Sequence, residues 1–230
     1  MSAAHRRPGL SKPVVLEAAI DYVDRFGLTE LSMRKLGAFL DVEGMALYRY
    51  VRSRDDLLDA VVDRLLDRLH ADPDVLLRPE DDWRDFLRRV AGGVRRTALE
   101  HPQIFPLIAT RHRAAPWIRP PLRSPRWIEG FLSALLSRGF SEDAAVHAYR
   151  AFGSFLVGHL LLEVGADGAG AADAPAGACR DVAPLDVSAY PVLARLADRL
   201  AAEDLGEEFE RSLEDLLERL EGARTRAPGP

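Results

Sequence analysis

Residues Leu36–Val61 read LGAFLDVEGMALYRYVRSRDDLLDAV, and this stretch is the most informative part of the chain. Its apolar spacing is interrupted at Asp41 and Glu43, and a strongly helical pattern begins after Ser53. Two short helices that flank a tight turn at residues 40–43 would be held together by apolar side chains, namely Leu36, Leu40, Val42 and Leu47. The pattern therefore predicts a helix-turn-helix unit, whose second helix can enter a major groove of DNA.

The second of these helices has a side that is expected to face outward, because Leu47 points inward by its spacing from Val42 and Val51. The outward side would carry Gly44, Met45, Ala46 and Tyr48. Small and apolar groups can approach thymine methyls, and a tyrosine hydroxyl can bind a phosphate oxygen. Arg34 could contact guanine, and Arg54, at the start of the next helix, could hold a phosphate. A packed helical corner with half-buried tyrosines and solvated arginines fits the spacing equally well.

The remainder of the chain also predicts helices and shows no strand-like alternation longer than a few residues. The expected helices cover residues 11–27, 32–40, 44–50, 53–72, 81–100, 102–109, 121–138, 142–164, 188–203 and 206–222. Ser11, Ser32 and Ser53 are candidate N-caps. The segment at 166–186 is rich in Gly, Ala, Asp and Pro, which predicts a mobile loop. The sequence thus predicts an all-α protein.

Composition and charge restrict the class of protein. The chain has 230 residues and 47% apolar content, enough for a sizeable core, and one cysteine, Cys179, which excludes an intrachain disulfide framework. No signal peptide or membrane span is evident, so a soluble cytoplasmic protein without a membrane partner is expected. Residues 1–54 hold nine Lys and Arg against six Asp and Glu, whereas residues 55–230 hold 22 against 30. A basic N-terminal region followed by an acidic remainder is typical of an N-terminal DNA-binding domain. A solvated charged surface explains this distribution of charge about equally well.

The segment LSKPVVLEAAIDYVDRFGLTELSMRKLGAFLDVEGMALYRYVRSRDDLLDAVVDRLLDRLH, residues 10–70, closely resembles the DNA-binding domain of the tetracycline-repressor (TetR) family. Asp41 stands where that family usually has glycine. Later segments, including DDWRDFLRRVAGGVRRTALEHPQ and EEFERSLEDLLERLE, resemble the tetracycline-repressor class of C-terminal domain. The resemblance implies a homodimeric repressor that binds a palindromic operator in double-stranded DNA and releases it when a small molecule binds. It also implies DNA contacts by Arg34, Gly44, Met45, Ala46, Tyr48, Tyr50 and Arg54.

The expected organisation follows from this resemblance together with the helical pattern. Residues 1–10 would form a flexible basic arm, 11–54 the three-helix DNA-binding domain and 55–72 a connecting helix. Residues 73–224 would form a larger helical domain for ligand binding and dimerisation, and residues 225–230 a frayed tail. Residues His5, Arg6 and Arg7 of the arm could follow the DNA backbone or enter a minor groove.

The resemblance also suggests the kind of ligand. In register with the family, His70 keeps the pocket histidine, whereas apolar residues replace the pocket asparagine, phenylalanine, metal-binding histidine and glutamine. These replacements are Val90, Val94, Ile108 and Phe131. Since Mg²⁺ requires a demanding octahedral ligand set, we expect no metal or other cofactor and a largely apolar effector, with Phe86 as a further contact. Each of these apolar residues could equally belong to the core of a helical bundle.

Two apolar stripes are candidates for a dimer interface made of two helices from each subunit. They comprise Ala148 and Phe152 on one helix and Phe209, Leu213, Leu216, Leu217 and Leu220 on the last helix. An enzyme is not expected, because no HExxH, phosphate-binding glycine loop or nucleophile elbow is present. The alternative function is an architectural DNA-binding protein that has no effector and needs no pocket.

Overall fold

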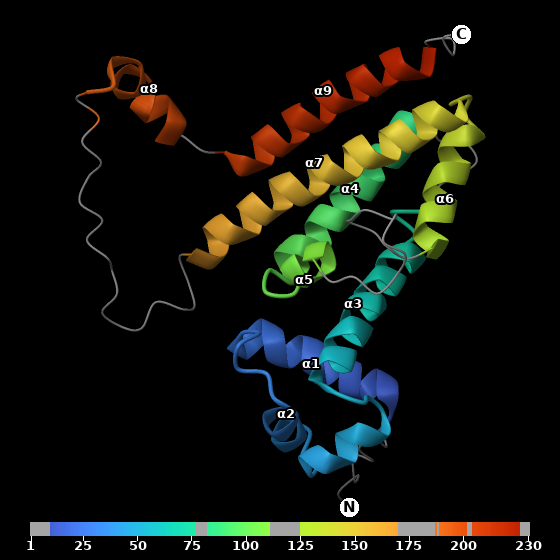
Figure 1. Ribbon diagram of the computed structural model, residues 1–230, viewed down its shortest axis with the longest axis vertical. Helices are drawn as coiled ribbons and strands as arrows, with labels where there is room; N and C mark the ends of the chain where they lie inside the picture. The colour runs from blue at the N-terminus through green and yellow to red at the C-terminus, as the bar shows by residue number, and fades with distance from the viewer. Residues whose placement is uncertain are drawn as a thin grey trace, which may run out of the picture.

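The computed structural model describes residues 10–76, 82–110, 125–169, 187, 189–201 and 204–225 (Figure 1). Within these ranges all regular secondary structure is helical, which confirms the predicted all-α fold. The helices are α1 (Lys12–Phe26), α2 (Met33–Phe39), the 3₁₀ helix η1 (Gly44–Arg49), α3 (Arg54–Ala71), α4 (Trp83–Glu100), α5 (Phe105–Thr110), α6 (Pro125–Leu136), α7 (Glu142–Ala169), α8 (Pro191–Ala201) and α9 (Leu205–Thr225). None of the described helices is both long and apolar enough to cross a bilayer.

Two of the three serines predicted as N-caps make the expected side-chain hydrogen bond. The hydroxyls of Ser32 and Ser53 accept hydrogen bonds from the backbone N–H groups of Lys35 and Asp56, at 3.2 and 3.0 Å. Ser11 precedes α1 but makes no side-chain cap bond. Helix α7 continues through Ala169, so the prediction of a loop that begins at residue 166 is wrong for residues 166–169. The rest of that predicted loop, residues 1–9 of the basic arm and residues 226–230 of the tail lie outside the described residues.

A single helix, α3, connects a small head to a larger helical body (Figure 1). It packs on α1 in the head and on α4 and α5 in the body. Seven apolar side chains of α3 are buried as a result: Leu57, Leu58, Val61, Val62, Leu65, Leu66 and Leu69. At a rise of 1.5 Å per residue its 18 residues span roughly 27 Å. A displacement of one end of this helix is therefore transmitted to the other.

Polar contacts also join the head to the rest of the molecule. Arg64 Nε of α3 donates to Glu17 Oε1 of α1 at 2.9 Å, and Arg68 binds the other oxygen of the same carboxylate. Burial raises the pKa of Glu17, but the hydrogen bonds from the two arginines outweigh it and lower the pKa. His101, just after α4, places Nδ1 2.8 Å from Asp24 Oδ2 of α1. The connecting helix α3 and the residue that follows α4 thus both make polar contacts with α1.

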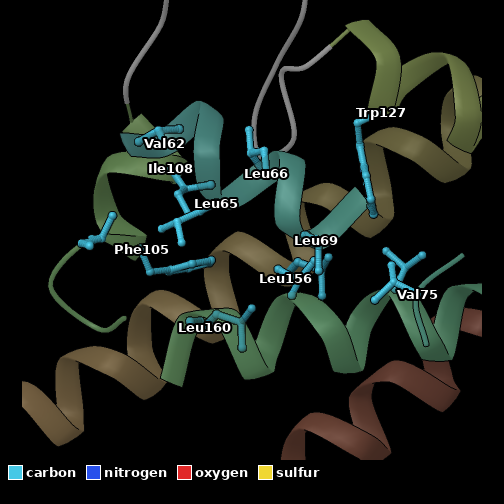
Figure 2. Close-up of a cluster of buried hydrophobic side chains, with 14 of the residues drawn as sticks. Val62, Leu65, Leu66, Leu69, Val75, Phe105, Ile108, Trp127, Leu156 and Leu160 are labelled. Atoms are coloured by element: carbon cyan, nitrogen blue, oxygen red, sulfur yellow. The ribbon is translucent and has the colours of Figure 1, made fainter. Parts of the chain in front are cut away.

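The core of the body lies among α3, α4, α5, α6 and α7. Helix α7 packs against α4, α5, α6 and α9, and it runs beside α9 along one edge of the body (Figure 1). Figure 2 shows side chains from α3, α5 and α7 gathered in this core, with Ile108 beside Leu65 and Phe105. Helix α8 stands apart in Figure 1 and buries no described side chain; Tyr190 before it and Val192 and Leu200 within it are exposed.

Candidate functional site

The turn between α2 and η1 is built by backbone hydrogen bonds that close the end of α2. The N–H of Asp41 donates to Ala38 O at 3.1 Å, and the N–H of Val42 donates to Gly37 O at 2.9 Å. Together they form a Schellman motif, which requires a left-handed residue at its centre. Asp41 takes that conformation with φ 59°. Glycine adopts it without steric cost, which explains why glycine is usual at this position in the family that the sequence resembles.

Two glycines allow η1 to lie directly on α2. A Cβ added to Gly37 would lie 2.7 Å from the Cα of Gly44, and one added to Gly44 would lie 3.0 Å from Met33 O. Gly44 was predicted to face DNA, but its α-carbon faces α2, so its role is to permit this close approach. Leu47 is fully buried, as its spacing predicts. The position of η1 is therefore determined by backbone contact as well as by side-chain packing.

The outer surface of this unit carries several of the predicted DNA-binding side chains. Met45 is 75% exposed and Tyr48 is 45% exposed. Ala46 is partly buried beside them, and Arg34 is exposed on α2, with its Cα next to Gly44. The structure thus brings Arg34, Met45, Ala46 and Tyr48 to one end of the head.

Two other predicted DNA contacts use their polar atoms inside the protein. The Tyr50 hydroxyl donates to Leu10 O at 2.7 Å and ties the start of the described chain to the end of η1. Arg54 donates from Nε to Leu31 O and from Nη2 to Leu28 O, both at 2.9 Å. These bonds hold the loop between α1 and α2 against the start of α3. Arg54 and the Tyr50 hydroxyl thus make structural contacts within the head, and their contacts with DNA stay predictions.

The body contains a cavity of about 280 Å³ at the far end of α3. It is lined by His70, Val75, Leu76, Phe86, Trp127, Gly130 and Phe131. Three of the six residues predicted to bind a ligand, His70, Phe86 and Phe131, therefore meet at one site. The other three, Val90, Val94 and Ile108, are buried in the core and do not line this cavity. For them the core alternative holds, because their helical faces pack against neighbouring helices instead of the cavity.

Aromatic rings and a histidine give the cavity its chemistry. The rings of Phe86 and Phe131 lie 5.9 Å apart, and the ring of His70 meets that of Trp127 edge-on at 6.0 Å. Burial lowers the pKa of His70, and the charge of Arg126 lowers it further. Among the described residues, the lining contains no carboxylate, lysine or arginine. The site thus suits an apolar molecule with one or two polar atoms.

Sequence reasoning missed Trp127, the residue whose indole covers the end of α3 (Figure 2). Trp127 lies four residues before Phe131 on α6. This spacing could have identified it as a cavity residue, since residues four apart share a helix face. Val75, Leu76 and Gly130 were also missed. The first two follow α3 in a short turn whose packing against α4 could not be read from helical periodicity.

Glu163 of α7 is a buried acid, and its carboxylate is paired with an arginine. Arg95 Nη2 donates to Glu163 Oε1 at 2.5 Å, and Arg95 Nε lies 3.1 Å from both carboxylate oxygens. These hydrogen bonds raise the pKa of Arg95. Among the described residues there is no cluster of three or more His, Cys, Asp or Glu that could hold a metal ion.

The predicted dimer-interface side chains lie in the protomer's own core. All seven are at most 3% exposed in the single chain: Ala148, Phe152, Phe209, Leu213, Leu216, Leu217 and Leu220. They pack α7 and α9 against each other and against the body, so they have almost no surface left for a partner. The prediction is therefore wrong for these side chains. Other side chains of α7 are exposed, namely Leu162, which is 73% exposed, and Val146.

Comparisons with known proteins agree with this architecture. A family model described as the tetracyclin repressor-like C-terminal domain matches residues 77–224. The tetracycline repressor protein class A from transposon 1721 of Escherichia coli is 31% identical over 158 residues, 69% of each chain. An HTH-type transcriptional regulator of Saccharopolyspora erythraea is 29% identical over 160 residues, which are 68% of this chain but less than two thirds, 62%, of that protein. A crystal structure of a possible TetR family regulator from Streptomyces coelicolor A3(2) superposes with a TM-score of 0.72 at 28% identity, covering 92% of this chain and 99% of that one.

Proposed function

Because the chain belongs to the tetracycline-repressor (TetR) family of transcriptional regulators, we propose that it is a ligand-responsive repressor that binds a palindromic operator as a homodimer. The observation that carries this proposal is the arrangement of α3. One end of that helix supports the head that presents Met45 and Tyr48, and the other end places His70 in the cavity. A single rigid element thus touches both the DNA-binding unit and the ligand site.

In the proposed mechanism, a ligand in the cavity stabilises a second position of α3. That shift changes the separation of the two heads in a dimer, which must match successive major grooves about 34 Å apart. A coupling free energy of about 1–3 kcal/mol would change operator affinity about 5- to 150-fold. The ion pairs of Glu17 and the contact between His101 and Asp24 keep the head attached to the body, so the motion of one reaches the other.

The effector is proposed to be a small, largely apolar molecule that binds without a metal. One relative is named a tetracycline repressor, but the described residues that line this cavity offer one imidazole and no carboxylate. Mg²⁺ prefers oxygen ligands in octahedral geometry, and this set of donors does not supply them. The apolar side chains Val75, Leu76, Phe86 and Phe131 instead favour a hydrophobic ligand.

The dimer is proposed to form through the outward faces of α7 and α9. Leu162 is a highly exposed apolar side chain of α7, and α8 follows with further exposed apolar residues. Replacing the highly exposed Leu162 by glutamate would place two charges in this interface. Sedimentation of wild-type protein and Leu162→Glu tests it: a dimer in both would contradict this placement, and a monomeric wild type would contradict the homodimer itself.

The decisive test of function is selection of bound sequences from a pool of random DNA duplexes. A regulator of this kind should select a palindrome, and Tyr48→Phe should weaken binding to it about two- to tenfold through loss of one hydrogen bond. Tyr190→Phe is the matched control, since Tyr190 is also an exposed tyrosine but precedes α8, far from the head (Figure 1). Salt-sensitive binding without a preferred sequence would contradict the proposal and favour the architectural alternative.

A further inference from the structure

The indole N–H of Trp127 is a buried hydrogen-bond donor without an acceptor among the described residues. The side chain is only 6% exposed, so water does not satisfy it freely. A buried donor left without a partner carries a desolvation cost, and most such groups in proteins are paired. Trp127 lines the cavity, so a molecule bound there can supply the missing acceptor.

The remaining features of the cavity restrict what that molecule can be. The faces of Phe86, Phe131 and Trp127 favour a flat aromatic skeleton, since aromatic rings gain from stacked and edge-to-face contacts with one another. None of the described residues that line the cavity carries a charged side chain, so an ionised ligand would lose its hydration without gaining a counter-charge from them. His70, the other polar group, has a lowered pKa and is neutral at neutral pH.

We infer that the effector is an uncharged, planar aromatic molecule that carries a carbonyl-type oxygen, and that this oxygen accepts a hydrogen bond from Trp127 Nε1. The inference rests on the proposed function, since it specifies the ligand of the proposed effector site. It makes Trp127 the residue that selects an oxygen-bearing ligand over the corresponding hydrocarbon. A site that leaves a buried donor unpaired discriminates against ligands that cannot satisfy it.

The test uses 9-fluorenone and fluorene, which share a three-ring skeleton and differ by a ring carbonyl in place of a methylene group. Equilibrium dialysis of the full-length protein against each probe gives two dissociation constants, and their ratio is compared between wild type and Trp127→Phe. This comparison cancels the difference in hydrophobicity between the probes. The preference for fluorenone should fall about two- to tenfold in Trp127→Phe, the effect of one hydrogen bond.

Trp83→Phe is the matched control, because Trp83 is also a buried tryptophan but does not line the cavity. The ratio should be the same in this variant as in wild type. An unchanged ratio in Trp127→Phe, or a wild type that binds neither probe, would overturn the inference. A ratio that falls in His70→Phe and not in Trp127→Phe would also overturn it, since His70 would then be the donor.

A measurement on unmutated protein makes the result independent of how Trp127→Phe folds. In protein labelled with ¹⁵N-tryptophan, fluorenone should shift the Trp127 indole N–H resonance markedly more than fluorene does. Equal shifts would contradict the hydrogen bond. Both experiments are done without DNA, so they can fail while operator selection succeeds, and operator selection can fail while the probes bind.

Discussion

Two adjacent glycines in α4 should respond in opposite ways to the same substitution. A Cβ added to Gly92 meets no atom within 4 Å. A Cβ added to Gly93 would lie 2.4 Å from Val75 Cγ2 and 3.0 Å from Leu69 Cδ1. The two positions share a helix and a backbone conformation, so the difference between Gly92→Ala and Gly93→Ala reports only the packing of α4 against α3 and the turn that follows it.

The magnitudes follow from helix propensity and overpacking. Alanine is favoured over glycine in a helix interior by about 1 kcal/mol, so Gly92→Ala should raise the free energy of unfolding by about 0.5–1 kcal/mol. At Gly93 the same gain is opposed by overpacking, which costs about 1–3 kcal/mol. Val75 is only 2% exposed and is β-branched, so it cannot turn away easily. Gly93→Ala should therefore be less stable than Gly92→Ala by about 1–3 kcal/mol.

Urea denaturation followed by circular dichroism measures both variants, at one protein concentration because the stability of a dimer, as proposed, would depend on it. Gly93→Ala should also bind 9-fluorenone more weakly than Gly92→Ala does, since displacing Val75 moves it into the cavity. A Gly93→Ala protein as stable as Gly92→Ala would refute the close approach of α4 to Val75. Equal probe binding in the two variants would refute the link between that contact and the cavity.

Three further predictions concern polar groups. Arg54→Lys should lower the free energy of unfolding by about 1–3 kcal/mol in urea denaturation, because an ammonium cannot replace the forked bonds of the guanidinium to two backbone carbonyls. Arg95→Met should lower it by about 3–5 kcal/mol in the same assay, because Glu163 would remain buried and unpaired; Arg95→Met with Glu163→Gln should recover part of the loss. His70 has a lowered pKa, so the unfolded chain binds more protons and stability should rise as the pH increases towards the unfolded value of about 6.5; thermal melts of His70→Gln between pH 5 and 7 should show a smaller rise.

Helical periodicity and turn signals were sufficient to predict the helices, because each depends on residues close together in the chain. The caps at Ser32 and Ser53 and the inward position of Leu47 were predicted correctly for the same reason. The boundary of α7 was not, since Gly165 and the residues after it are poor helix formers by composition. A long helix can continue through such residues when its preceding turns are well packed.

The sequence did not reveal what individual side chains contact across the molecule. Arg54 reads as a phosphate-binding residue at a helix N-terminus, but the carbonyls of Leu28 and Leu31 come within reach only after α1, α2 and α3 have packed. The apolar spacing on α9 predicts an interface or a core equally well. Because Leu217 is fully buried in the single chain, the stripe belongs to the core. Neither contact has a local signature.

The sequence by itself determined the all-α architecture, the helix-turn-helix unit and the family, because local periodicity, caps and motif spacing depend on short-range interactions. Only the tertiary structure decided which of the six candidate ligand residues meet in a cavity and that Trp127 leaves a donor unpaired beside them. It also decided that the apolar stripes of α7 and α9 are buried within the single chain. Burial and hydrogen-bond pairing depend on residues far apart in the chain, and these are brought together only when the helices pack.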